Sequence, residues 1–254
     1  MAEHVNPLPF ALAAITLVLA FCGVALGRFM VRRSADDARS DTRNFIRIVI
    51  TLMTSMVGLL LSLQLSSAKA AFDAQERQVT EVSSEIIFLD TALAHSGRGS
   101  QSARTTLYDT VEEMYQHAWP DEVPGKRVQV PPGADALYEQ IDAIAPANES
   151  QRFAKARALT AAIDAGKTVR LISQEGKSSA TGALLAVEIA WTGVIFILYG
   201  LLAPSNRAAA VVLVLTAAAV ASAIFLIAEL STPFSGIIRI SSVPVERAMS
   251  EIGR

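Results

Sequence analysis

The sequence predicts an all-α membrane protein with four transmembrane helices and a large helical insert between the second and third of them. Three observations lead to this fold class. Hydrophobic residues make up 52% of the 254 residues and charged residues only 18%, against about 25% charged in soluble domains. The apolar residues are concentrated in four runs, each long enough to cross a hydrocarbon core that needs about 20 residues. The remaining sequence is polar and has helical periodicity.

The four apolar runs are expected to be membrane-spanning helices, because a helix satisfies its own backbone hydrogen bonds in lipid. Buried helices of a soluble protein are the alternative, but four runs of this length with so few charges do not fit one soluble core. The runs are Leu8–Met30, Phe45–Ala68, Ala183–Ala203 and Ala208–Leu230. They divide the chain into a first helix pair, an extramembrane helical domain, a second helix pair and a C-terminal tail, at residues 8–68, 69–182, 183–230 and 231–254.

The polar segment between the helix pairs is predicted to be a bundle of amphipathic helices. The first continues from the second span and ends near residues 95–97, with apolar residues at heptad-like spacing: Phe72, Val79, Val82, Ile86, Leu89 and Leu93. Further helices are expected over 107–118, over 137–144 and from 148 onward, with a Pro/Gly-rich loop at 120–133 and breaks allowed at Gly166 or Gly176. Either a helical bundle or a coiled-coil stalk between subunits would bury these stripes.

No enzymatic chemistry is indicated. The histidines His4, His95 and His117 are scattered, and HExxH and CxxC patterns are absent from the sequence. Residues 165–168 imitate the end of a phosphate-binding loop, but Ala161 stands where that motif needs glycine. We therefore expect no catalytic site, no metal and no cofactor. The net charge of −2 also argues against nucleic acid as a partner.

The second span carries small or polar residues on one helical face, spaced by four, three, four and four positions: Thr51, Ser55, Gly58, Ser62 and Ser66. This polar stripe has two interpretations. Hydroxyl groups can replace part of the hydration shell of an ion, which favours a pore lining. Small residues also let helix backbones approach closely, which favours helix packing.

Two other features lie inside the apolar runs. Gly23 and Gly27 form a GxxxG pattern, which is typical of closely packed helices. Glu188 lies near the start of the third span, and Glu229 lies at the end of the fourth. A carboxylate in a bilayer is costly and often functional, although near a boundary it can also reach the interface.

The sequence that ends the fourth span carries a family resemblance. Glu229 is followed by Pro233, Phe234 and Gly236, and then by an Ile-Arg-Ile-Ser stretch around Arg239. This tail resembles the end of the bacterial bestrophin-like domain family of membrane proteins, whose function is largely uncharacterised. The resemblance extends over nearly the whole chain through weaker matches at Leu59, Leu60, Phe72, Arg77, Trp191, Pro204 and Asn206.

The resemblance implies a function, because bestrophins proper are pentameric anion channels whose second helix lines the pore. It therefore implies a homo-oligomeric ion channel with the polar stripe as candidate lining. The alternative is a non-conducting sensor or scaffold whose polar segment binds a protein partner. In bestrophins an acidic calcium-binding cluster follows the Pro-Phe turn, but here Ile237, Ile238 and Arg239 follow it, so no calcium site of that type is expected.

The expected location is the bacterial cytoplasmic membrane, as a multi-pass protein. Short cytoplasmic loops are rich in Lys and Arg. The loop between the first two spans, with its flanks and Arg207, has seven arginines, whereas the two terminal tails together have three. This rule places the polar segment outside the cytoplasm, whereas a bestrophin-like orientation places it inside. We favour the charge rule, because it rests on this sequence.

Overall fold

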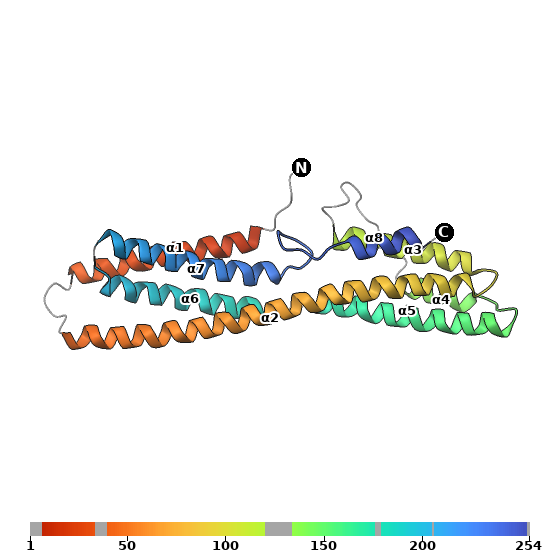
Figure 1. Cartoon of the computed structure of the whole chain (residues 1–254), viewed down its shortest axis with the longest axis horizontal. Helices are drawn as coiled ribbons and strands as arrows, with labels where there is room; N and C mark the ends of the chain where they lie inside the picture. Colours follow the sequence, from red (N-terminus) through yellow and green to blue (C-terminus); the bar gives the residue numbers. More distant parts are fainter. Residues whose placement is uncertain (1–6, 34–39, 120–133, 176–178, 205, 253–254) are drawn as a thin grey trace. The chain divides into compact units, whose positions relative to one another are not determined.

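The computed structural model describes residues 7–33, 40–119, 134–175, 179–204 and 206–252. Every regular element in these ranges is an α-helix (Figure 1). The helices are α1 (Pro7–Arg33), α2 (Ser40–Ala94), α3 (Ser100–Ala118), α4 (Ala134–Ala143), α5 (Glu149–Glu175), α6 (Ser179–Leu202), α7 (Arg207–Leu230) and α8 (Val243–Glu251). Four of them, α1, α2, α6 and α7, are long and apolar enough to cross a membrane. The predicted all-helical class and the four candidate spans are therefore confirmed.

The chain forms two compact units, and the boundary between them falls inside α2, after Ala71. We call them the membrane unit and the polar unit. The membrane unit comprises Val5–Ala71 and Ser178–Thr232. Of the described residues, the polar unit comprises 72–119, 134–175 and 233–252. The C-terminal residues thus cluster with the polar insert although they follow the last span in the sequence.

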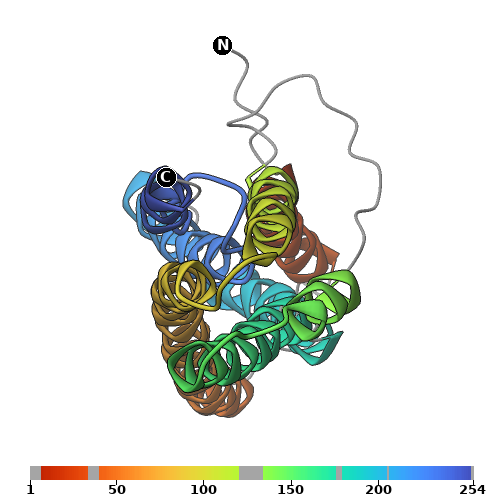
Figure 2. The same ribbon diagram turned by 90° about the vertical axis from the view of Figure 1, so that its right-hand side faces the viewer.

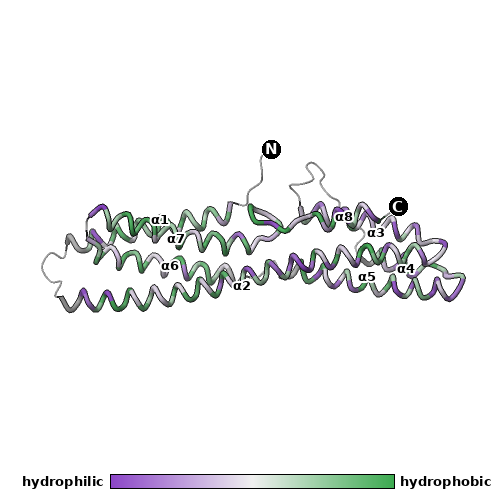
Figure 3. The backbone as a smooth tube through the Cα atoms, in the orientation of Figure 1, coloured by the Kyte–Doolittle hydropathy of each residue, from purple (hydrophilic) through white to green (hydrophobic). Residues whose placement is uncertain are grey.

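In the membrane unit, α1 packs against α6 and α7, and hydrophobic residues are dense along these three helices (Figure 3). The first part of α2 joins them through a hydrophobic cluster made of Val57, Leu61, Leu185, Ile189, Ile195, Ile224 and Ile227. Only 11% of the apolar window of α2 and 39% of that of α6 is buried by the chain itself. Most of the apolar surface of α2 is therefore left for lipid or for other protein copies.

Glycines bring α1 and α6 into close contact. A Cβ atom added at Gly200 would lie 2.5 Å from the carbonyl oxygen of Val24, and one at Gly23 would lie 3.0 Å from that of Gly193. A Cβ at Gly27 would overlap the backbone of Ile197. The predicted close-packing role of Gly23 and Gly27 is confirmed, with α6 as the partner helix.

The polar unit buries the stripe that the sequence predicts on α2. Phe72, Val79, Val82, Ile86, Leu89 and Leu93 are all buried, as are Leu107, Leu137 and Ile141 on the predicted faces of α3 and α4. Figure 2 looks nearly along these helices, which run in roughly similar directions. Asp90 on α2 pairs with Arg104 on α3 through two bonds of 2.8 Å, and the Tyr138 hydroxyl donates to the Ala162 carbonyl. The amphipathic helices are thus packed into one bundle.

The structure refines the sequence analysis at three places. The helix α5 continues through Gly166 and ends at Glu175, immediately before Gly176. Residues 231–254, expected to be only a tail, contain the helix α8. That helix begins at Val243 with Pro244 in its first turn, where a missing N–H costs nothing. The predicted loop at 120–133 lies outside the described residues.

Candidate functional site

The membrane part of α2 has three distinct faces. Val57 and Leu61 are buried against α6 and α7. Large apolar side chains form a second face, where Leu52, Leu59 and Leu63 are 70%, 73% and 67% exposed. The five residues of the polar stripe form the third face, and all of them are exposed. At about 100° per residue, the stripe lies roughly 140° around the helix from Val57 and roughly 80° from the leucine face.

Two hydroxyl groups of the stripe donate their hydrogen bonds to backbone carbonyls of α2 itself. The Thr51 hydroxyl donates to the Arg47 carbonyl at 3.0 Å, and the Ser62 hydroxyl donates to the Gly58 carbonyl at 2.8 Å. Each oxygen keeps lone pairs that could accept a hydrogen bond or contact a cation. A Cβ atom at Gly58 would meet no described residue within 4 Å, so no close contact in this part of the chain requires this glycine. The described residues of the same protomer therefore leave the stripe uncovered.

Glu188 on α6 is a buried carboxyl group inside the membrane unit. It is 2% exposed, and neither of its oxygens has a hydrogen-bond partner among the described residues. Thr192 lies one turn further along, is also 2% exposed, and has an equally unpartnered hydroxyl oxygen. Glu188 follows the start of the apolar window at Gly182 by six residues, or roughly 9 Å. Glu188 was predictable from the sequence as a carboxyl group in a span, whereas Thr192 was not, because a single threonine in an apolar helix is an ordinary residue.

Glu229, the other carboxylate near a span boundary, is fully buried at the end of α7. Its carbonyl oxygen accepts hydrogen bonds from the Thr232 backbone N–H at 3.1 Å and from the Thr232 hydroxyl at 3.2 Å. These bonds satisfy a carbonyl that the helix end would otherwise leave without a partner. The backbone of Glu229 therefore helps to terminate α7 before the Pro-Phe turn.

The family tail motif closes a small loop in the polar unit. The Ile240 N–H donates to the Pro233 carbonyl at 2.7 Å, and Gly236 has a φ of 105°, which favours glycine. Phe234 meets the ring of Trp119 edge to face, and the Trp119 indole N–H donates to the Ile240 carbonyl at 2.9 Å. Pro233, Phe234 and Gly236 therefore hold the chain after α7 against the end of α3. The sequence gives no sign of Trp119 as their partner, because 114 positions separate it from Pro233.

Within the described ranges, no three His, Cys, Asp or Glu side chains are grouped closely enough to hold a metal ion. Polar groups inside the membrane unit include hydroxyls, the Gln64 amide, the carboxyl groups of Glu188 and Glu229, and arginines near the helix ends. Such groups can contact ions, protons or lipid headgroups without forming a metal centre.

The four candidate spans and the bundled polar insert define a multi-pass α-helical membrane protein. Comparison with protein families identifies it further, because the Bestrophin-like domain model matches residues 14–245. The chain therefore belongs to the bestrophin-like domain family, as the tail motif predicted. Searches of curated proteins and of solved structures found no match.

Proposed function

We propose that this protein is an oligomeric ion channel in which the polar stripe of α2 from several copies lines the ion path. One observation carries the proposal. Thr51, Ser55, Gly58, Ser62 and Ser66 are all exposed on a face that is separate from the large leucines of the same helix. A helix surrounded only by lipid would not need a polar face separate from its apolar face.

The three faces of α2 suit three different surroundings. The face with Val57 packs on its own chain, and the face with Leu52, Leu59 and Leu63 suits acyl chains. The third face has small side chains, which leave room, and hydroxyl oxygens, which can replace water around an ion. Copies of α2 arranged around an axis with this face inward would form a narrow polar path. Close helix packing between copies also fits small residues, so conduction must be measured directly.

The test is single-channel recording from the purified full-length protein in planar lipid bilayers. We expect discrete openings in the wild type. The unitary conductance should be lower in the Ser55→Leu and Ser62→Leu variants, because leucine narrows the ion path and makes its lining hydrophobic. Ser222→Leu is the matched control, since Ser222 is an exposed serine on α7 whose hydroxyl bonds the carbonyl four residues earlier, as that of Ser62 does. Silent bilayers from folded, oligomeric protein would contradict the proposal.

A second candidate function, a non-conducting sensor or scaffold, is favoured by one observation on the polar unit. The Arg157 guanidinium lies 4.7 Å from the ring centroid of Phe88 and 5.7 Å from that of Phe153, and these rings are 41% and 65% exposed. They line a shallow cavity of about 520 Å³ between α2 and α5. Exposed arginine and aromatic residues are frequent at protein-binding sites. This function would be favoured if the protein passed no current in bilayers and if it bound a partner protein that the Phe153→Ala variant no longer binds.

A further inference from the structure

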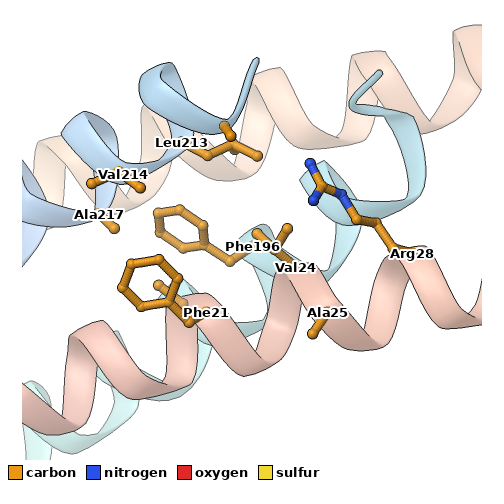
Figure 4. A pocket seen from close by; sticks show the side chains of 10 residues that line it. Phe21, Val24, Ala25, Arg28, Phe196, Leu213, Val214 and Ala217 are labelled. Atoms are coloured by element: carbon orange, nitrogen blue, oxygen red, sulfur yellow. The ribbon is translucent and has the colours of Figure 1, made fainter. Parts of the chain in front are cut away.

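A groove on the membrane unit lies between α1, α6 and α7 (Figure 4). Its cavity volume is about 180 Å³, and its lining is almost entirely apolar: Ala20, Phe21, Val24, Ala25, Phe196, Ala210, Leu213, Val214 and Ala217. Phe21 and Val214 are 53% and 44% exposed, so the groove opens on the surface of the helices. Sites that enclose a whole drug-sized molecule measure roughly 300–1,000 Å³. This groove therefore suits one segment of a chain molecule.

Among the described residues that line the groove, Arg28 near the C-terminal end of α1 is the charged one. Figure 4 shows its side chain at one end of the groove, with Phe21 and Phe196 further along. The Nε atom of Arg28 is buried and has no hydrogen-bond partner among the described residues. A buried donor without an acceptor is destabilising, so a ligand that supplies an acceptor at this point would be favoured.

A second positive charge lies at the same end of the groove. Arg207 begins α7 one turn before Ala210, which lines the groove, and its side chain is exposed. The two arginines thus stand where an apolar groove reaches the end of the spans. Lipid headgroups occupy that level of a bilayer, and basic residues there attract anionic ones.

We propose that this groove binds an anionic phospholipid, with an acyl chain against Phe21, Phe196 and Val214 and the phosphate on Arg28. A soluble phosphate would leave the apolar lining unused, and a zwitterionic lipid would bring its own cationic ammonium group towards the same two arginines. Arg28 provides the donors for the phosphate, as guanidinium groups do in paired geometry. Arg207 adds attraction without direct contact with the groove. The proposal is independent of ion conduction, because it concerns a different face of the membrane unit.

The test is native mass spectrometry of the full-length protein, released from detergent after incubation with phosphatidylglycerol or with phosphatidylcholine of the same acyl chains. We expect phosphatidylglycerol to be retained preferentially. Arg28→Gln should lower that preference by about fivefold, the factor expected for one basic residue at an anionic surface. Arg47→Gln is the matched control, because Arg47 is an exposed arginine at the start of another span and does not line the groove.

The apolar part of the site has its own test. Val214→Phe should fill the groove and reduce retention of both lipids, whereas Val212→Phe on the same helix should not, because Val212 is exposed but outside the groove. Equal retention of the two lipids by the wild type, or an unchanged preference in Arg28→Gln, would overturn the proposal. Competition by inorganic phosphate alone would also overturn it in favour of a free anion. A smaller oligomer in Val214→Phe would instead assign the groove to a neighbouring copy.

Discussion

The ring of Phe234 lies 5.4 Å from that of Trp119, at an interplanar angle of 85°. This edge-to-face contact joins the family tail motif to the end of α3, and Trp119 also donates to the carbonyl of Ile240. The Ile240 N–H in turn bonds the Pro233 carbonyl. One tryptophan, which follows directly on α3, therefore fixes both ends of the turn. The hydroxyl of Tyr115 in the last turn of α3 donates to the Glu246 carboxylate of α8 at 3.0 Å. The tail motif acts as an anchor within the polar unit.

Phe234→Ala should therefore lower the stability of the protein by about 2 kcal/mol, below the usual cost of a buried Phe→Ala change because this ring is half-buried. Pro233→Ala should also change stability or assembly more than ion selectivity. Thermal midpoints of the purified protein measure the first effect, and bilayer recordings measure the second. Ile237→Ala is the control, since its side chain is 63% exposed in the same turn. An altered ion preference at an unchanged midpoint would argue against an anchoring role.

Gly27→Ala should separate α1 from α6, because the added methyl group would meet the Ile197 carbonyl and the Leu201 backbone. Overpacking of this kind costs about 1–3 kcal/mol. Gly58→Ala is a matched control in another span, where the methyl group would meet nothing within 4 Å of the same protomer. The expected result is a lower thermal midpoint for Gly27→Ala and an unchanged midpoint for Gly58→Ala. Equal midpoints for wild type and Gly27→Ala would contradict the close contact.

The helices were predictable because their signals are local. Apolar runs, heptad-like spacing and the positions of Gly and Pro are each visible within one segment of the sequence. The ends of α2 and α5 accordingly fall close to the expected positions. The helix α8 was missed because it is short and polar, and its stability depends on contacts such as that between Tyr115 and Glu246. The pairing of Trp119 with Phe234 and the groove beside Arg28 could not be predicted either, because helices distant in the sequence form them.

Glu85 in the polar unit should make stability depend on pH. Burial raises the pKa of its carboxyl group above 4.5, and the nearby charge of Glu81 raises it further, while a hydrogen bond with Thr168 acts in the opposite direction. Between the unfolded and folded pKa values, the folded state therefore binds more protons than the unfolded state. The contribution of Glu85 is most favourable below pH 4.5 and is lost as pH rises through the folded pKa.

Glu85→Gln should remove this dependence. We expect the variant to have a higher thermal midpoint than the wild type at pH 7 and a similar midpoint at pH 4, because glutamine cannot ionise. Glu139→Gln, at an exposed position on α4, is the control for losing one negative charge. The pH profile of the midpoint difference between variant and wild type is the measurement. A difference that does not change between pH 4 and pH 7 would contradict the assignment.

Glu188→Leu should stabilise the protein by about 1–3 kcal/mol, because it removes a carboxyl group whose oxygens have no partner among the described residues and adds apolar contact. Glu188→Gln should have a smaller effect, since a buried polar group remains. Thermal midpoints of both variants, with single-channel recording of each, distinguish two roles. A stable Glu188→Leu protein with unchanged current would show that Glu188 lowers stability and takes no part in conduction. A stable but silent protein would instead show that ions or protons use this carboxyl group.

The orientation of the polar unit can be decided by cysteine labelling. Ser100 is 8% exposed and would label poorly, whereas its neighbour Gln101 is exposed on α3. Gln101→Cys in a Cys22→Ala background, treated with a membrane-impermeant maleimide, reports which side of the membrane carries α3. Ser40→Cys at the start of α2 is the reciprocal probe, because it lies at the other end of the second span.

The charge rule predicts labelling of Gln101→Cys in intact cells and of Ser40→Cys only after the cells are permeabilised. Its physical basis is that seven arginines flank the short loops at one end of the spans, and positively charged loops are retained in the cytoplasm. The reverse pattern would give the bestrophin-like orientation. In that case the arginine count would not have set the orientation. The rule applies to short loops, and a segment as long as the polar unit can be an exception to it. Arg28 and Arg207 would then face the outer leaflet, and the lipid bound beside them would come from that side.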